Sequence, residues 1–139
     1  MKLPEDEMQM IRSSLGLRRA TVAVDIDGTL CHYEGWFGQE RFGCVFPGAK
    51  EFLSKLAEEF DIIIYSCRTS EEINSPGETA QAITNIQKWL ESNGLIYHHI
   101  YVGKGKPIAL FYVDDRAVTC SPTKDPEAFN KALVAMGLL

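Results

Sequence analysis

The sequence predicts an α/β protein built on a doubly wound, three-layer, Rossmann-like parallel sheet. Three apolar runs, at about 20–25, 61–65 and 108–113, each lead directly into polar residues. Unbroken apolar runs of this length are typical of strands buried on both faces of a parallel sheet. Helical patterns alternate with the strands, which favours right-handed crossovers between parallel strands.

The remaining elements follow from periodicity and from stop signals. Apolar residues at helical spacing predict helices over 5–17, 49–60, 79–92 and 126–136. Asn93-Gly94 marks the end of the third of these helices, and Asp125 stands where it can cap the fourth. A short strand is expected at 99–102, which brings the number of expected strands to four.

Two segments show neither period. Residues 71–77 form a polar stretch that predicts a loop, and 31–46 are rich in glycine and aromatic residues. The second segment predicts a loop or a small hairpin, here called the flap. We therefore expect a helical extension over 1–18 and a single domain over 19–139 that carries the flap.

Composition limits the partners of the chain. The formal net charge of −5 and the pI near 5.2 offer no basic surface for binding nucleic acid in bulk. The first residues are acidic where a signal peptide would be basic, and no apolar run approaches the ~18 residues of a membrane span. Four scattered cysteines are typical of reduced thiols. These features predict a cytoplasmic protein that does not bind membranes.

Asp25 and Asp27 are the most informative residues of the chain. They follow the first predicted strand one residue apart, on a turn opened by Gly28. Carboxylates held this closely repel each other unless a cation neutralises them or one of them keeps its proton. An acidic pair at the end of a buried strand therefore indicates a functional site.

Further polar side chains follow the other strands. Ser66 and Arg68 come after the second apolar run, Lys104 and Lys106 precede the last strand, and the acidic pair Asp114 and Asp115 ends it. In doubly wound sheets, ligands bind beyond the carboxyl ends of the strands. We expect all of these side chains to meet at one mouth.

Taken together, these residues resemble the motifs of the haloacid dehalogenase-like phosphatase superfamily. Its first motif reads DxDGT, its second is a Ser or Thr at a strand end, its third is a Lys and its fourth is an acidic pair; the match spans about residues 21–118. The resemblance implies the strand order 3-2-1-4. Because the segment 31–46 is too short to be a cap domain, it also implies a small capless member with an open site.

The resemblance implies a role for each site residue and Mg²⁺ as cofactor. Asp25 would attack phosphorus and ligate the metal. Asp27 would act as general acid and base, with its backbone carbonyl on the metal. Ser66 would bond a phosphoryl oxygen and Lys106, preferred over Lys104, would neutralise charge. Asp115 would ligate the metal directly, with Asp114 behind it.

Several assignments stay open at this point. Gly28 permits the tight turn, and Thr29 can bond the backbone that follows it; both are grouped with Arg68 as substrate-binding residues. Arg68 alternatively pairs with Glu71 or Glu72 on the surface. The aromatic residues of the flap form either a small core of their own or a platform for a leaving group.

The predicted function is that of a Mg²⁺-dependent phosphomonoester hydrolase acting through an aspartyl-phosphate. The substrate is a small phosphoester or a polynucleotide end, and a second subunit is a further candidate for closing the open site. A polynucleotide 3′-phosphatase is the alternative within the class. A phosphotransferase and a non-catalytic module that binds metal and phosphate are the alternatives outside it.

Overall fold

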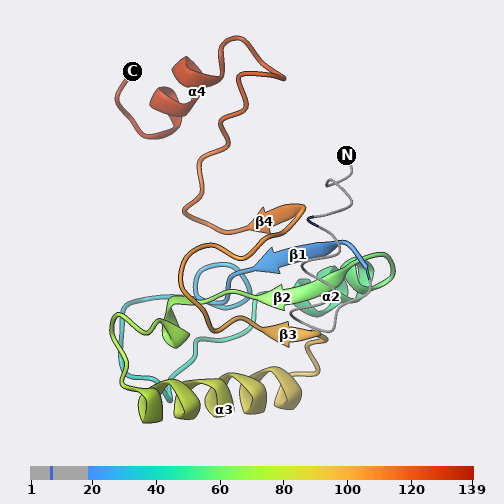
Figure 1. Ribbon diagram of the computed structural model, residues 1–139, viewed down its shortest axis with the longest axis vertical. Helices are drawn as coiled ribbons and strands as arrows, with labels where there is room; N and C mark the ends of the chain where they lie inside the picture. The colour runs from blue at the N-terminus through green and yellow to red at the C-terminus, as the bar shows by residue number, and fades with distance from the viewer. Residues whose placement is uncertain (1–6, 8–18) are drawn as a thin grey trace.

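The chain folds around a four-stranded parallel sheet. The computed structural model describes Glu7 and residues 19–139 (Figure 1). The strands are β1 (Thr21–Val24), β2 (Asp61–Ile64), β3 (His99–Ile100) and β4 (Phe111–Val113). They lie in the order β3-β2-β1-β4, and every neighbouring pair is parallel. The predicted α/β class, the parallel sheet and the strand order are confirmed.

The two central strands are fully buried, and the two edge strands are shorter than predicted. All eight residues of β1 and β2 are buried, as expected for strands with neighbours on both sides. The last strand was expected from residue 108, but pairing with β1 begins only where Leu110 donates to the carbonyl of Thr21. Pro107, just upstream, has no N–H for a ladder.

Helices α2 (Ala49–Ala57) and α3 (Pro76–Ser92) pack against one face of the central strands. Helix α3 begins before residue 79, where the sequence analysis places its start, because Ser75 and Glu78 form a capping box. The predicted loop over 71–77 therefore ends at Ser75. The pattern Ser-Pro-x-Glu was the sequence signal for this earlier start.

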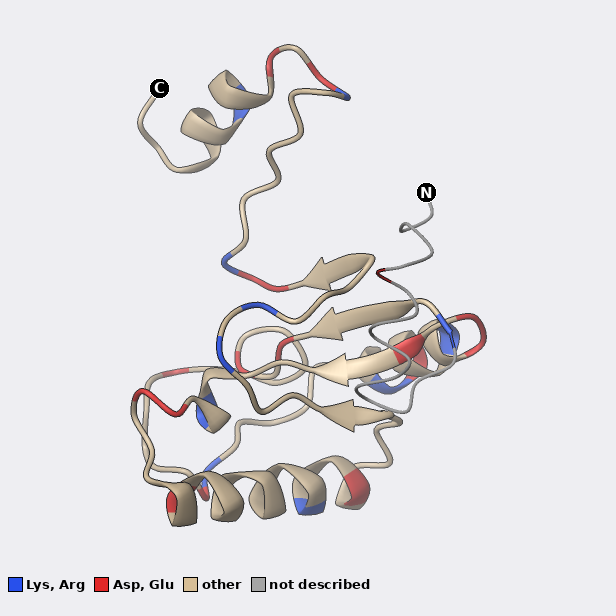
Figure 2. Ribbon diagram, viewed as in Figure 1, with Lys and Arg blue, Asp and Glu red and all other residues tan. Residues whose placement is uncertain are grey.

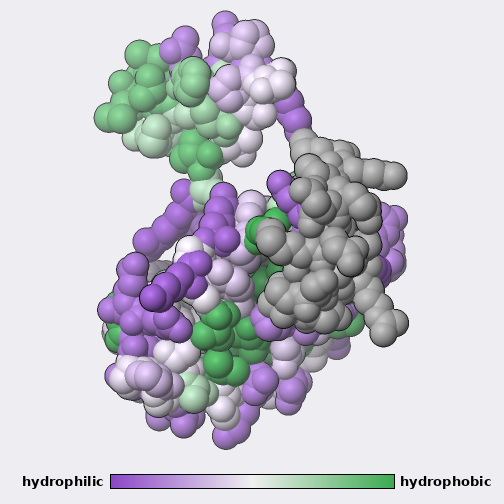
Figure 3. Space-filling view, in the orientation of Figure 1, coloured by the Kyte–Doolittle hydropathy of each residue, from purple (hydrophilic) through white to green (hydrophobic). Residues whose placement is uncertain are grey.

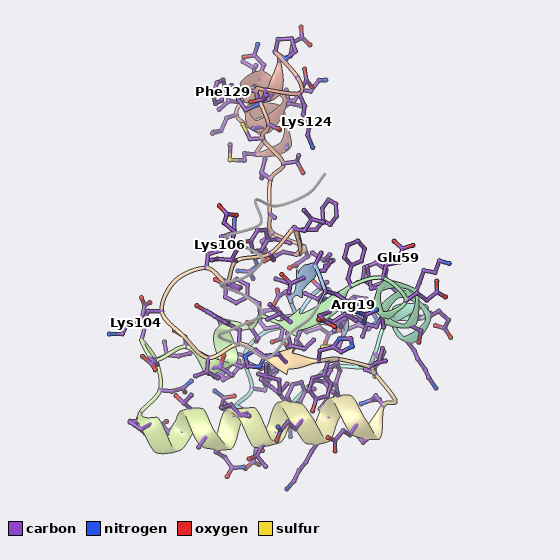
Figure 4. All side chains as sticks on the ribbon, turned by 45° about the vertical axis from the view of Figure 1, so that its right-hand side comes forward. Arg19, Glu59, Lys104, Lys106, Lys124 and Phe129 are labelled. Carbon is purple, nitrogen blue, oxygen red and sulfur yellow. The ribbon has the colours of Figure 1, made fainter. Side chains whose placement is uncertain are left out.

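Helix α4 (Ala128–Ala135) stands apart from the sheet, at the end of the chain that leaves β4 (Figure 1). The predicted cap at Asp125 is wrong: Glu127 occupies the N-cap position without a side-chain hydrogen bond. Asp125 instead accepts from the backbone of Glu127 and pairs with Lys131. Phe129 and Leu138 are about two thirds or more exposed. Figure 3 shows hydrophobic residues gathered on this segment, and Figure 4 labels Phe129 there.

The flap is closed at its base by backbone hydrogen bonds. His32 donates to Cys44 at 3.0 Å, and Phe46 donates to Leu30 at 2.9 Å. Gly43 is required here, since a Cβ atom at this position would lie 2.0 Å from the carbonyl oxygen of His32. The flap is thus a hairpin-like loop, one of the two forms expected from the sequence.

The helix expected over 5–17 lies, apart from Glu7, outside the described residues. Within Glu7 and 19–139, no helix combines the length and the apolar character needed to cross a membrane.

Candidate active site

Three carboxylates from two adjacent strands converge at the carboxyl end of the sheet. Asp25 follows β1, and Asp114 and Asp115 follow β4; Figure 2 shows the acidic segments directly after both arrowheads. The backbone N–H of Asp25 donates to Val113 at 3.0 Å, which fixes the two strand ends to each other. One carboxylate oxygen of each residue lies within 4.8 Å of those of the other two. The predicted meeting of these side chains is therefore found in the structure.

Gly28 and Thr29 hold the two acidic turns together. Gly28 has a φ of 83°, and a Cβ atom there would lie 2.4 Å from a carboxylate oxygen of Asp115. Thr29 was expected to bond the backbone that follows it. Its hydroxyl instead accepts from the backbone N–H of Asp115 at 3.2 Å. Gly28 thus leaves room for the Asp115 side chain beside the turn after β1, and Thr29 holds the backbone of Asp115 there.

Burial and neighbouring acids raise the pKa of Asp25 to about 6. Burial of the carboxyl is the largest cause, and the charges of Asp114, Asp27 and Asp115 act in the same direction, against a hydrogen bond from the backbone of Ile26. A divalent cation among these carboxylates would reverse this penalty. Oxygen ligands of this kind suit Mg²⁺, so the residues present fit the cofactor that the sequence analysis expects.

The raised pKa of Asp25 predicts a pH-dependent effect of Asp25→Asn on stability. Between pH 4 and 6, folded Asp25 keeps a proton that the unfolded chain has lost, so the wild-type protein loses stability as the pH rises through this window. The amide carries no charge. In a chelator, we expect Asp25→Asn to raise the melting temperature at pH 7 and to change it little at pH 4. An equal shift at both pH values would contradict the raised pKa assigned to Asp25.

Arg68 is buried against Asp27. Its side chain is 3% exposed, and its Nε and Nη2 donate to the two carboxylate oxygens of Asp27 at 2.8 and 2.9 Å. The two residues are 41 positions apart, so no local spacing in the sequence could reveal the pair. Bidentate pairing of this kind fixes both the position and the orientation of a carboxylate.

Arg68 also anchors the flap. Its Nη1 donates to the carbonyl of Gln39 and its Nη2 to that of Arg41, at 3.1 and 2.7 Å. Its guanidinium carbon lies 4.0 Å from the ring centroid of Phe42 and 5.0 Å from that of Trp36. The alternative of a surface pair with Glu71 or Glu72 is wrong, because the side chain is buried. Among the residues that the structure describes, these contacts use four of the five N–H groups of Arg68. The substrate contact predicted for Arg68 stays a prediction.

The flap's aromatic residues divide between a core and a surface. Phe42 stacks on Trp89 of α3 with ring centroids 4.9 Å apart, so it belongs to the flap's packing. Trp36 lines the cavity beside the acidic residues. Phe37 is 67% exposed and borders a neighbouring depression, which shares Asp27 and Tyr33 with that cavity. The alternative of a small core therefore holds for Phe42, and a platform for a leaving group stays a prediction.

Ser66 lies at the bottom of the site. It is 6% exposed, and its Oγ accepts from the backbone N–H of Arg68 at 3.2 Å, capping the 3₁₀ turn η1 (Cys67–Thr69). It also borders a cavity of about 840 Å³ that contains the predicted acids Asp25, Asp27 and Asp114. This volume falls within the usual range for small-molecule sites, roughly 300–1,000 Å³.

The two candidate lysines lie on the connection between β3 and β4 (Figure 4). Lys104 borders the cavity, in an exposed stretch between two glycines. Lys106 directly precedes Pro107, which is buried and whose carbonyl accepts from the hydroxyl of Tyr112. The Nζ of Lys106 lies 3.9 Å from the centroid of the Tyr112 ring. The role predicted for Lys106 stays a prediction, and Lys104 is its competitor.

We expect Lys106→Ala to lower kcat more than Lys104→Ala does. The anchored backbone at Pro107 restricts where the charge of Lys106 can reach, and a fixed charge stabilises a transition state better than a mobile one. Steady-state kinetics of the two variants, measured side by side, tests this. A larger loss in Lys104→Ala would transfer the role to Lys104.

The chain is similar to solved structures, whereas no family model and no curated protein matches it. Among solved structures, it is similar to a conserved protein from Bacteroides thetaiotaomicron, with 25% identity, 82% of this chain and 92% of that chain covered, and a TM-score of 0.49. It is also similar to the D,D-heptose 1.7-bisphosphate phosphatase from B. bronchiseptica, solved with magnesium and phosphate, at 11% identity, with 85% and 64% covered and a TM-score of 0.42. Both TM-scores are below 0.5.

Proposed function

We propose that this protein is a Mg²⁺-dependent phosphomonoester hydrolase that acts through an aspartyl-phosphate on Asp25. The observation that supports the proposal most strongly is the convergence of Asp25, Asp114 and Asp115 beside Asp27. Phosphoryl transfer of this kind needs a nucleophilic carboxylate, a second carboxylate for proton transfer and a set of oxygen ligands for a hard cation.

Each site residue has its own role in the proposed reaction. Asp25 attacks phosphorus and displaces the leaving group, and Ser66 donates a hydrogen bond to a phosphoryl oxygen. Asp27 first takes up a proton from solvent, against the two hydrogen bonds by which Arg68 favours its charged form. It then protonates the leaving oxygen and afterwards accepts a proton from the water that hydrolyses the aspartyl-phosphate. Arg68 holds Asp27 in position for both steps. Lys106 neutralises negative charge on the phosphoryl group.

Asp25, the backbone carbonyl of Asp27 and Asp115 would hold Mg²⁺, which when bound screens charge between the phosphate and its attacking carboxylate. Asp115 is the better direct ligand of the acidic pair. One carboxylate oxygen of Asp114 already accepts from the backbone N–H of Arg116 at 2.7 Å.

We therefore expect Asp115→Ala to weaken Mg²⁺ binding by about tenfold or more, and Asp114→Ala to weaken it less. Titration calorimetry with MgCl₂ on the three proteins measures this without reference to activity. Undiminished affinity in Asp115→Ala would move the direct ligand role to Asp114.

Hydrolysis of para-nitrophenyl phosphate tests the proposed activity. Turnover should require added Mg²⁺ and disappear in a chelator. Release of phosphate in equal amount to nitrophenol identifies a hydrolase, whereas transfer to an added alcohol would identify a phosphotransferase. Absence of turnover at any Mg²⁺ concentration would favour a non-catalytic module that binds metal and phosphate.

A polynucleotide 3′-phosphatase is not favoured by the site. Arg68, the residue expected to hold a neighbouring phosphate, is engaged with Asp27 and the flap. Closure of the site by a second subunit and a cytoplasmic location stay predictions.

A further inference from the structure

Four aromatic rings surround the acidic site. Tyr33 and Trp36 come from the flap, Tyr65 follows β2 and Tyr101 follows β3; all four line the cavity that contains Asp25. Phosphoryl transfer at Asp25 requires none of these rings. Their position beside the proposed nucleophile therefore bears on what the phosphoryl group is attached to.

The rings on the sheet side are held rigidly. Tyr65 and Tyr101 meet edge to face, with centroids 5.8 Å apart at 75°. The hydroxyl of Tyr101 donates to the carbonyl of Lys104 at 3.3 Å. Gly103 permits this placement, since a Cβ atom there would lie 2.7 Å from that hydroxyl oxygen. The wall is thus preorganised, which lowers the entropic cost of binding.

The rings on the flap side keep free faces. Trp36 lies over the Arg68 guanidinium at 5.0 Å yet is 48% exposed, and Tyr33 lies 5.9 Å from Arg116 and is 42% exposed. Because Arg68 binds the flap backbone, Asp27 and the Trp36 ring together, it places Trp36 beside the reacting centre. Exposed rings with fixed positions are suitable stacking platforms.

The charges around the cavity restrict the ligand further. Among the residues that the structure describes, five acids border it, including Glu71 and Glu72 on the connection between η1 and α3, against two bases, Lys104 and Arg116. After one phosphoryl group and one divalent cation have bound, a second phosphate would meet an excess of negative charge. A leaving group bound here should therefore carry no negative charge.

From these observations, and resting on the proposed phosphatase function, we propose that the substrate is a small phosphomonoester whose leaving alcohol carries a planar aromatic ring and no negative charge. The ring stacks on the flap aromatics while the phosphoryl group faces Asp25. A nucleobase and a simple aryl ring share this chemistry, and the experiment separates them.

Matched substrate pairs test the proposal. Benzyl phosphate and cyclohexylmethyl phosphate differ in the aromaticity of the ring, and uridine 5′-monophosphate and ribose 5-phosphate differ in the base. We expect the aromatic member of at least one pair to have a kcat/KM about tenfold higher, the effect of one stacked ring. A preference in the first pair alone identifies an aryl ligand, and a preference in the second identifies a nucleobase.

Flap variants show where the preference arises. Trp36→Leu should bring the ratio within the preferred pair close to one, whereas a merely structural defect would slow both members alike and leave the ratio intact. Phe37→Leu is the matched control. This aromatic residue is also exposed and follows Trp36 directly, but it does not line the cavity that contains Asp25, so its loss should leave the ratio unchanged.

Equal kcat/KM within both pairs would overturn the proposal, as would an unchanged ratio in Trp36→Leu. A 3′-phosphorylated oligonucleotide hydrolysed faster than every member of the pairs would overturn it in favour of a polynucleotide substrate. Failure of the proposed function would give a different result. In that case, either no member of the two pairs would be hydrolysed, or Asp25→Asn would hydrolyse them as fast as the wild type does.

Discussion

Asp25→Asn should abolish phosphatase turnover while the protein stays folded. The amide has nearly the volume of the carboxylate but neither its charge nor its nucleophilicity. We expect kcat for para-nitrophenyl phosphate to fall by about four orders of magnitude or more, as for other enzymes that lose a nucleophile. Circular dichroism and the melting temperature at pH 7 serve as controls for folding.

The result that would contradict this assignment is a well-folded Asp25→Asn protein that retains substantial turnover. Because the same substitution removes a buried negative charge that also lies beside other acids, the inactive variant should be more stable than the wild type at pH 7 in a chelator. Loss of activity together with a gain of stability separates a catalytic defect from an unfolding one.

Arg68→Ala should have the largest effect on stability of any substitution at this site. It leaves the Asp27 carboxylate, whose side chain is 13% exposed, without its partner, and it removes two hydrogen bonds to the flap. Breaking a buried pair in this way costs about 3–5 kcal/mol. Chemical denaturation followed by circular dichroism measures the loss in the free energy of unfolding.

Two further variants make the Arg68 prediction specific. Arg68→Lys keeps the charge but cannot reproduce the bidentate contact, so it should recover only part of the stability. Arg41→Ala is the matched control: Arg41 is an exposed flap residue that contributes its backbone carbonyl to Arg68, and its loss should cost little. Comparable losses in Arg68→Ala and Arg41→Ala would contradict a central role for the Arg68–Asp27 pair.

Patterns along the chain were sufficient for the sheet and for the acidic centre. Apolar runs that end in carboxylates identified β1 and β4, and parallel strands place such endings at one edge. This is why Asp25, Asp114 and Asp115 could be predicted to meet before the fold was known. The early start of α3 was also readable, from the capping box at Ser75 and Glu78.

Contacts between side chains far apart in the chain could not be predicted from the sequence. The pairing of Arg68 with Asp27 depends on how the turn after β2 faces the turn after β1, and no local period encodes that. The same holds for Thr29, which bonds the turn after β4, and for Tyr65 and Tyr101, whose rings meet only because β2 and β3 are neighbours. Position along a strand predicts which edge a residue reaches, but not its partner there.

Trapping a covalent phosphoryl group on Asp25 tests the proposed hydrolysis mechanism most directly. Asp27→Asn should slow hydrolysis of the intermediate, because the amide cannot accept a proton from water. After this variant has been mixed with para-nitrophenyl phosphate and Mg²⁺ and quenched in acid, peptide mass spectrometry should find one phosphoryl group on the segment that contains Asp25. Rapid release of nitrophenol without a phosphorylated peptide, or with the phosphoryl group on another residue, would contradict the account.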